Sequence, residues 1–357
     1  MPLPPSRLRK PTGPAPEQLR DRSRGALLGL AVGDAFGTTQ EFKQLPAPPF
    51  PQFALGPQTE ILGGGPFQLR PGQVTDDTQM AVALAQSLRG LQRYDQTETF
   101  RRYKAWLPHA FDVGQQTRAA LEGTNLALGP DHGARTHWIQ NAKRPAGNGS
   151  LMRTAPIGVY FSSPADREAR IRASLEDSAI THVDPRCQLA CVAFNAAVAA
   201  AIHTPGTVQP SRLVSQLSAE LSIGAATLGR TMKDHVREVQ EAVQVLREDL
   251  RAAEQDDPRL YGPDLHLHLQ AGFVRVAFRL AFWELFHAPS FEAAIIDVAN
   301  RGGDADTNAA ITGALLGAVY GEQAIPSKWR AAVLEALPIQ PALRDVYHPR
   351  ELLPLAG

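Results

Sequence analysis

Helical periodicity runs through most of this chain and limits what it can fold into more than any other feature. From about residue 17 onward, apolar residues recur at spacings of three and four, and Ala, Leu, Arg and Glu dominate the long segments. Alternating runs such as His266 to Leu269 are too short to build a sheet. The chain is therefore predicted to be all-α. The predicted helices cover residues 17–36, 76–91, 95–107, 113–127, 165–180, 186–202, 211–221, 228–253, 271–287, 291–300, 306–320 and 328–336.

Proline and glycine mark the breaks between these helices. The proline-rich stretch 45–57 and the glycines at 63–65 predict a long loop, and residues 256–263 break the chain before its last helices. Neither break resembles a domain linker. We therefore predict a single domain over residues 17–357, preceded by a flexible proline-rich tail at residues 1–16.

Two sets of glycines recur every four residues, one near each end of the chain. A helix that presents glycine at this spacing lets another backbone approach closely. Each glycine costs a helix about 1 kcal/mol, which suggests that the close approach is used. We expect both segments to be central, tightly packed helices. The glycines are Gly25, Gly29, Gly33 and Gly37 in the first set, and Gly313, Gly317 and Gly321 in the second.

The composition is that of a compact enzyme without a strong electrostatic preference. The 36 basic and 36 acidic residues cancel, so no general attraction to nucleic acid or to an anionic membrane is expected. No segment offers an uninterrupted apolar stretch of about 20 residues, and the N-terminus lacks a signal-peptide pattern. Cys187 and Cys191 are expected to be buried thiols in a reducing compartment. These features predict a cytoplasmic protein.

Two acidic clusters, Thr75-Asp76-Asp77-Thr78 and Asp304-Ala305-Asp306-Thr307, each begin a predicted helix at opposite ends of the chain. Each could simply start its helix, with Thr75 as N-cap and acids in the first turn. Together they supply four carboxylates and at least two hydroxyls, the hard oxygen ligands that suit Mg²⁺ or Mn²⁺. Both follow tight turns that contain glycine. They predict a metal-dependent hydrolase, provided that the fold brings the two clusters together.

The order of motifs along the chain resembles that of the ADP-ribosylglycohydrolases, which include dinitrogenase reductase-activating glycohydrolase and the ADP-ribosylarginine and ADP-ribosylserine hydrolases. The resemblance spans about residues 20 to 335. The motifs that carry it are Gly25-Ala26-Leu27-Leu28-Gly29 through Gly33-Asp34-Ala35-Phe36-Gly37 with Glu41 beyond, Thr75-Asp76-Asp77-Thr78, Gly147-Asn148-Gly149-Ser150-Leu151-Met152-Arg153, Thr181-His182 and Gly303-Asp304-Ala305-Asp306-Thr307.

This resemblance implies a compact orthogonal α-helical bundle that holds two divalent cations, Mg²⁺ or Mn²⁺. Glu41 matches a central acidic residue of the family that can contact metal or substrate. The residues that match the family's metal ligands are Thr75, Asp76, Asp77, Asp304, Asp306 and Thr307.

Cleavage of a glycosidic bond at ADP-ribose passes through an oxocarbenium-like state. A carboxylate must then accept a proton from the attacking water. The candidates for this catalytic role are Glu41, Asp77 and Asp304, and the sequence does not rank them.

The resemblance also implies a substrate-binding surface. Gly147-Asn148-Gly149-Ser150 is expected near the diphosphate, where its backbone N–H groups suit a phosphate, although a plain turn is the alternative. His182 is expected to contact the phosphates, although an isolated histidine is more often structural. A weaker resemblance places Gly114, within residues 112–118, in the same pocket. His266 and His268 are interpreted as loop residues and not as a second metal site.

The predicted activity is hydrolysis of the bond between ADP-ribose and a modified acceptor, and ADP-ribosylarginine in proteins is the favoured acceptor. The open alternatives are ADP-ribosylserine, O-acetyl-ADP-ribose, a two-metal nucleotide phosphoesterase and a catalytically silent ADP-ribose-binding homologue. The expected partner is an ADP-ribosylated protein or a small ADP-ribose conjugate, and the protein is expected to be a monomer.

Overall fold

The computed structural model describes residues 14–45, 56–204, 208–339, 343 and 346–357. Over these residues the chain is built from helices joined by turns and loops, with only isolated β-bridges and no strand, which confirms the all-α prediction. Most of the predicted tail, residues 1–13, and most of the predicted loop at 45–57 lie outside the described residues. The assignment of residues 17–357 to a single domain stays a prediction.

The α-helices are α1 (Pro16–Gly37), α2 (Asp76–Leu91), α3 (Gln96–Trp106), α4 (Gln115–Gly123), α5 (His132–Gln140), α6 (Ala155–Tyr160), α7 (Arg167–Thr181), α8 (Pro185–His203), α9 (Pro210–Thr231), α10 (Val236–Ala253), α11 (Val274–His287), α12 (Phe291–Asn300), α13 (Ala305–Tyr320) and α14 (Ser327–Glu335). The 3-10 helices include η1 (Thr38–Gln40), which follows α1, η5 (Lys233–His235), which lies between α9 and α10, and η8 (Pro349–Ala356) near the C-terminus.

Helices α1 and α13 pack backbone against backbone, and they run antiparallel. A Cβ added at Gly25 would lie 2.2 Å from the Gly317 carbonyl oxygen, and one at Gly29 would lie 2.2 Å from that of Gly313. The contact continues through Gly33, where an added Cβ would lie 2.0 Å from the carbonyl oxygen of Ala309. The prediction of two tightly packed glycine-bearing helices is therefore confirmed.

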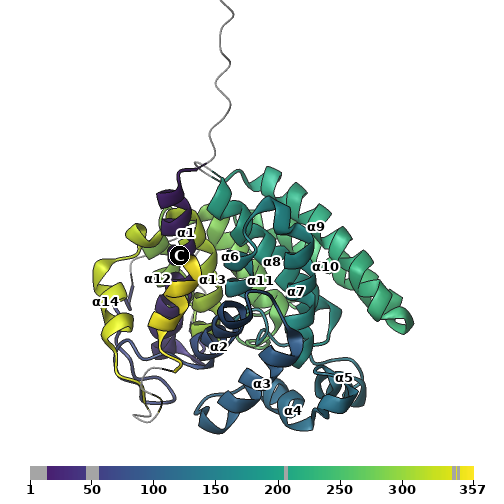
Figure 1. Ribbon diagram of the computed structural model, residues 1–357. Helices are drawn as coiled ribbons and strands as arrows, with labels where there is room; N and C mark the ends of the chain where they lie inside the picture. The colour runs from purple at the N-terminus through teal and green to yellow at the C-terminus, as the bar shows by residue number, and fades with distance from the viewer. Residues whose placement is uncertain (1–13, 46–55, 205–207, 340–342, 344–345) are drawn as a thin grey trace, which may run out of the picture.

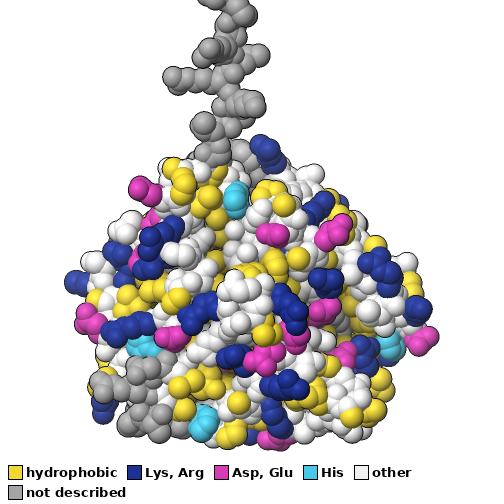
Figure 2. Space-filling view, in the orientation of Figure 1, with side chains coloured by type: hydrophobic (Ala, Val, Ile, Leu, Met, Phe, Trp, Pro, Cys, Tyr) yellow, Lys and Arg dark blue, Asp and Glu magenta, His cyan; other side chains and the backbone are white. Residues whose placement is uncertain are grey.

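The other helices surround this pair (Figure 1). Helices α3, α4 and α5 lie together at the lower edge of the view, and α9 and α10 form its right flank. The main hydrophobic core draws on buried side chains from α1, α2, α8, α11 and α13. The face in Figure 2 intersperses basic and acidic side chains, in keeping with the zero formal charge.

Three helix predictions need correction. The predicted helices 211–221 and 228–253 have their break in the wrong place, because α9 runs through it from Pro210 to Thr231 and the chain turns through η5 before α10 begins at Val236. The predicted helix 113–127 is shorter, since α4 covers only Gln115–Gly123. Helices α5 and α6, of nine and six residues, were not predicted.

We expected no segment that could span a membrane. Helix α8 differs from this expectation, because by length and composition alone it could cross one. Within this helix, 89% of the most apolar window is buried inside the protein. The core helix of a soluble protein passes the same test, so this one helix is weak support for a membrane span.

Candidate active site

The packing of α1 against α13 brings the two acidic clusters together. Because the helices run antiparallel, the C-terminal end of α1, with Asp34, lies beside the N-terminal end of α13, with Asp304 and Asp306. Helix α2 begins at the same place with Asp76 and Asp77. The Thr307 hydroxyl lies 3.4 Å from the Asp77 carboxylate, although the two residues are 230 positions apart in the sequence.

A backbone pairing adds Glu41 to the same site. The Phe42 N–H donates to the Gly303 carbonyl at 2.6 Å, and the Gly303 N–H donates to Lys43 at 2.8 Å. Gly302 and Gly303 have φ of +71° and +67°, which glycine adopts without strain. The turn that precedes Asp304 therefore holds the segment that carries Glu41.

Asp34, which belongs to α1, accepts hydrogen bonds from the first residues of α2. Its Oδ1 accepts from the Thr75 N–H at 3.0 Å, and its Oδ2 accepts from the Thr78 N–H at 3.1 Å and the Thr78 hydroxyl at 2.5 Å. The side chain of Thr75 makes no cap hydrogen bond within α2, and that of Asp304 makes none within α13. Thr75 and Asp304 thus occupy the N-cap positions of their helices, as the alternative interpretation expected, but their side chains do not cap them.

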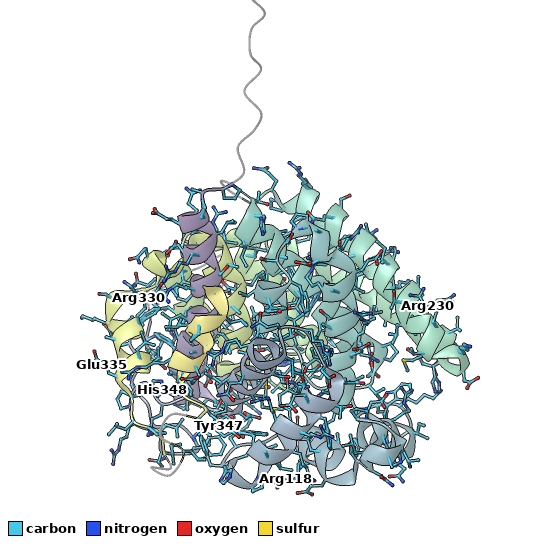
Figure 3. All side chains as sticks on the ribbon, in the orientation of Figure 1. Arg118, Arg230, Arg330, Glu335, Tyr347 and His348 are labelled. Carbon is cyan, nitrogen blue, oxygen red and sulfur yellow. The ribbon has the colours of Figure 1, made fainter. Side chains whose placement is uncertain are left out.

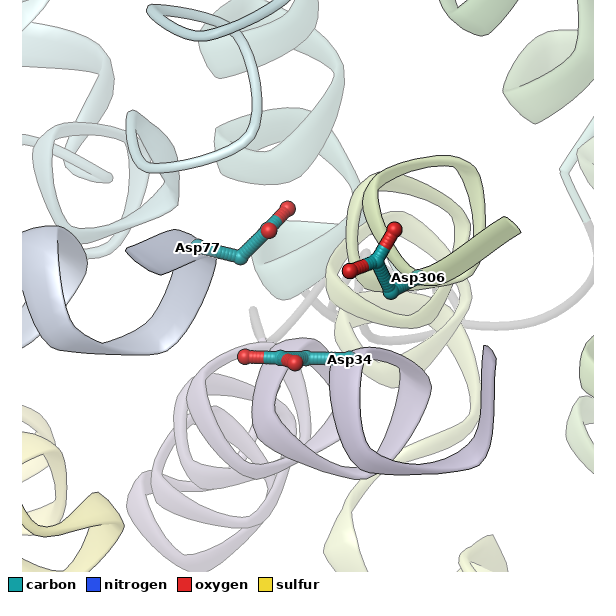
Figure 4. Close-up of side chains that lie close together, drawn as sticks. All are labelled: Asp34, Asp77 and Asp306. Carbon is teal, nitrogen blue, oxygen red and sulfur yellow. The ribbon is translucent and has the colours of Figure 1, made fainter. Parts of the chain in front are cut away.

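Two groups of carboxylates converge closely enough to share cations. Carboxylate oxygens of Asp34, Asp77 and Asp306 all lie within 4.8 Å of one another, and Figure 4 shows these side chains pointing toward a common centre from α1, α2 and α13. A second group with the same spacing contains Glu41, Asp112 and again Asp306. Asp306 therefore belongs to both groups.

Burial and mutual repulsion favour the protonated, uncharged form of the carboxyl groups in this cluster. Burial, followed by the neighbouring carboxylates, raises the pKa of Asp76, Asp77 and Asp306 well above the ordinary value. The same causes raise the pKa of Glu41 to about 9 and that of Asp112 to about 7.

Asp34 and Asp304 are less perturbed because each accepts hydrogen bonds. Burial raises the pKa of Asp34 to about 6, and the hydrogen bonds from Thr78 and Thr75 oppose this shift. Burial also raises the pKa of Asp304, whose Oδ2 accepts from the Asn148 amide at 2.7 Å, and this bond opposes the rise.

The residues present fit a pair of divalent cations. Glu41 Oε2 and Asp77 Oδ1 are buried without a hydrogen-bond partner among the described residues, and an oxygen-only ligand set suits Mg²⁺ or Mn²⁺. Concentrated buried carboxylates also need positive charge to be ionised together. Asp34 differs from the others, because its oxygens are already occupied by α2.

The predicted metal ligands all lie at this centre, in different environments. Asp77 and Asp306 belong to the close groups, and Asp76 and Asp304 line the adjacent cavity without belonging to either. The Thr75 hydroxyl lies 3.0 Å from both Asp34 Oδ1 and Asp77 Oδ2, so its single proton serves one of them. Thr307 lines the cavity.

A cavity of about 260 Å³ opens beside the acidic centre. Its lining includes carboxylates of the acidic centre, the loop of Gly147, Asn148 and Gly149, and His182. Gly114 and Thr117 contribute from the α4 side, whereas Arg118 points away and Figure 3 places it at the lower edge of the molecule, where it pairs with Glu122 at 3.3 Å.

Ser150 is the predicted substrate residue that does not line this cavity. It is fully buried behind the loop, where its hydroxyl accepts from Ser178 at 2.9 Å. Its side chain therefore supports the loop from behind.

His266 and His268 lie in a turn region, as predicted, and serve as local hydrogen-bonding groups. His266 Nδ1 accepts from the His268 N–H at 3.2 Å, and His268 Nε2 lies 2.8 Å from the Arg301 carbonyl. This second contact supports the turn that leads to Asp304.

The sequence reasoning missed three residues of the site. Asp34 stood inside a quoted motif, but only a long-range contact reveals its role. Asp112 is the first residue of the weakly resembling segment 112–118, but it was given no role as an acidic ligand. Arg153 closes the 147–153 motif, and its complete burial could not be read from the sequence.

Comparison with known proteins agrees with this geometry. The chain matches the family model described as ADP-ribosylglycohydrolase over residues 15–354. It is 30% identical over 318 residues to the ADP-ribosylarginine hydrolase Tri1 of Serratia proteamaculans (strain 568), covering 87% of this chain and 74% of that protein. It is 31% identical over 329 residues to the ADP-ribosyl-(dinitrogen reductase) glycohydrolase of Rhodospirillum rubrum, covering 89% and 91%.

A solved structure described as an ADP-ribosylglycohydrolase-related protein complex shares the fold. Its chain superposes with a TM-score of 0.63 at 27% identity, covering 95% of this chain and 98% of that one. The chain therefore belongs to the ADP-ribosylglycohydrolase family and is a glycosidic-bond hydrolase.

Proposed function

We propose that this protein removes ADP-ribose from modified arginine side chains of proteins in a reaction that depends on two divalent cations, Mg²⁺ or Mn²⁺. One observation carries the proposal: carboxylates from α1, α2 and α13 converge beside a cavity that is also lined by the loop of Gly147–Gly149 and by His182. The preference for arginine is supported by the similarity to an ADP-ribosylarginine hydrolase in two organisms, Serratia proteamaculans and Pseudomonas putida.

Asp77, Asp306, Glu41 and Asp112 would hold the cations, with Asp306 common to both. When bound, two divalent cations orient ribose hydroxyls and acidify the attacking water. Asp34 keeps the start of α2, and with it Asp77, in place.

Glu41 is the proposed general base. Its Oε2 has no hydrogen-bond partner among the described residues, and it lines the cavity. Asp77 and Asp304 are weaker candidates, because Asp77 contacts two hydroxyls and Asp304 accepts from Asn148.

The loop at 147–149 and His182 are proposed to receive the diphosphate. The Gly147 and Asn148 N–H groups already donate to Gln116 Oε1 and the Gly272 carbonyl, which leaves the Gly149 N–H for the ligand. Gly147 and Gly149 bring the backbone close to the His182 ring, since an added Cβ would lie 3.2 Å and 3.1 Å from Nε2 respectively. Gly114 borders the same cavity from α4.

The test is product analysis with defined substrates. Peptides carrying ADP-ribose on arginine or on serine, and O-acetyl-ADP-ribose, are incubated with Mg²⁺ or Mn²⁺, and the products are separated by chromatography. The proposal predicts free ADP-ribose from the arginine peptide and faster turnover of it than of the others. AMP or inorganic phosphate would indicate a phosphoesterase, and ADP-ribose binding without turnover a silent homologue; either result would contradict the proposal.

A matched pair of variants ties this activity to the acidic centre. Asp306→Asn is expected to abolish turnover, because both carboxylate groups lose their shared member. Asp234→Asn makes the same chemical change at an exposed position in η5 and is expected to retain activity. Equal activity in both variants would separate the reaction from this site.

A further inference from the structure

A buried arginine lies directly behind the loop that forms one wall of the cavity. Arg153 is fully buried, and every side-chain nitrogen donates a hydrogen bond. Its acceptors are Tyr103 Oη at 3.0 Å, the Gly149 carbonyl at 2.8 Å, Thr181 Oγ1 at 2.8 Å and the Asp177 carbonyl at 3.0 Å. The guanidinium is therefore fixed in both position and direction.

The Thr181 hydroxyl connects this arginine to His182. Thr181 Oγ1 lies 2.8 Å from His182 Nδ1 and is 1% exposed as a residue, so the hydroxyl cannot turn to solvent. Arg153 only donates, so the oxygen accepts from it and keeps its own proton free. Among the described residues, His182 Nδ1 is the remaining partner for that proton. The hydroxyl therefore donates, and Nδ1 accepts.

An imidazole that accepts at Nδ1 carries its proton on Nε2 when it is neutral. Burial, Arg153 and His137 lower the pKa of His182 well below its ordinary value, which favours the neutral ring. The Nε2 edge lies against Gly147 and Gly149 and lines the cavity, and the described residues give this atom no hydrogen-bond partner. The ring therefore turns an N–H toward the space where a ligand binds.

We propose that Arg153 and Thr181 are positioning residues that lock His182 in the neutral Nε2–H tautomer, so that it donates one hydrogen bond to an oxygen of the bound ligand. The identity of that ligand rests on the proposed function: the oxygen is one of the diphosphate oxygens of ADP-ribose. The opposite tautomer would leave the buried Thr181 proton without an acceptor, which is costly.

The tautomer can be measured without any ligand. In ¹⁵N-labelled protein, multiple-bond ¹⁵N–¹H spectra distinguish a protonated from an unprotonated ring nitrogen, and His182→Gln identifies the His182 signals by their loss. The expected result is a protonated Nε2 and an unprotonated Nδ1. A protonated Nδ1 with an unprotonated Nε2, or a doubly protonated ring at pH 7, would overturn the proposal.

Variants of Thr181 test the relay. Thr181→Val keeps the shape and removes the hydroxyl, so Nδ1–H should become populated and the affinity for ADP-ribose should fall about tenfold. Thr181→Ser restores the hydroxyl and should restore both the tautomer and the affinity to within about twofold. A Val variant that keeps the wild-type tautomer and affinity would show that the hydroxyl has no such role.

The two proposals fail separately. Absence of ADP-ribose binding in the wild-type protein would contradict the proposed function, whereas the tautomer measured in the free protein would still decide the relay. Arg153→Lys is a less direct test because a buried guanidinium with this many partners also stabilises the fold. If Thr181→Val does not fold, the wild-type spectrum and the Ser variant still give the answer.

Discussion

Among the acidic residues of the site, Asp34 has a structural role, because its oxygens bond to neighbouring protein groups. Its carboxylate accepts backbone and hydroxyl protons at the start of α2, and so a side chain from α1 does the work of an N-cap. Hydrogen bonds to a charged group stabilise a fold by about 1.5–3 kcal/mol each. The placement of Asp77 therefore depends on a residue that sequence reasoning assigned no role.

Thr78→Val tests this contact because it removes only the hydroxyl that donates to Asp34. We expect the free energy of unfolding to fall by about 1–3 kcal/mol, measured by chemical denaturation. Thr312→Val is the matched control, since Thr312 is equally buried and its hydroxyl has no partner among the described residues. The control should be neutral or stabilising, and equal losses in both variants would contradict the role of Asp34.

Glu41→Gln tests the proposed general base at nearly constant shape. We expect kcat to fall by about 10²–10⁴-fold, the usual contribution of a positioned base, in a protein that still folds. Steady-state kinetics on an ADP-ribosylated arginine peptide measures this loss. A variant with kcat within about twofold of the wild type would move the role to Asp77 or Asp304.

At the scale of elements, the antiparallel contact of α1 with α13 builds the site. The backbone carbonyl groups of each helix occupy the space that a side chain on the glycines of the other helix would need. The four-residue spacing of these contacts continues from Gly313 and Gly317 through Ala309 and Ala305. Asp34 lies at the end of one helix and Asp306 at the start of the other, so the register of this contact sets the distance between them.

Gly29→Ala places a methyl group 2.2 Å from the Gly313 carbonyl oxygen, so the backbones must separate. We expect a loss of about 1–3 kcal/mol or more in stability, together with loss of activity, because the two ends of the site move apart. Gly229→Ala in α9 is the matched control, since nothing lies within 4 Å of its added Cβ. It should gain up to about 1 kcal/mol from helix propensity. An active, stable Gly29→Ala protein would show that the close contact is not needed.

Much of the element pattern could be predicted from periodicity, and the reasons for the failures are local. The break between α9 and α10 falls at Met232–His235, where neither glycine nor proline marks it. The acidic clusters were recognised because their residue types suit a cation. The roles of Asp34, Asp112 and Arg153 depend on contacts with distant parts of the chain, and local sequence patterns do not encode such contacts.

At the scale of the whole molecule, a fold with no net charge brings several buried carboxylates together at one place. Without cations, this gathering opposes folding. The raised pKa values mean that the folded chain binds more protons than the unfolded one between about pH 4, the ordinary carboxyl value, and the value of about 9 for Glu41. The stability of the metal-free protein must therefore fall as the pH rises through this range.

Thermal unfolding after chelation tests this linkage. The melting temperature of the metal-free protein should be higher at pH 6 than at pH 8.5, and Mn²⁺ should raise it most at the higher pH, where the carboxylates are unprotonated. Metal-free Asp306→Asn should show a shallower dependence on pH, because one raised group is gone. A flat profile for the wild type, or one that rises with pH, would contradict the account.

The most direct measurement is anomalous diffraction from crystals grown with Mn²⁺. The account predicts two manganese peaks per chain, one beside Asp77 and one beside Glu41 and Asp112, with Asp306 contacting both. A chain with no peak at these carboxylates, or with manganese bound only elsewhere, would contradict the claim that distant acidic segments form one binuclear centre.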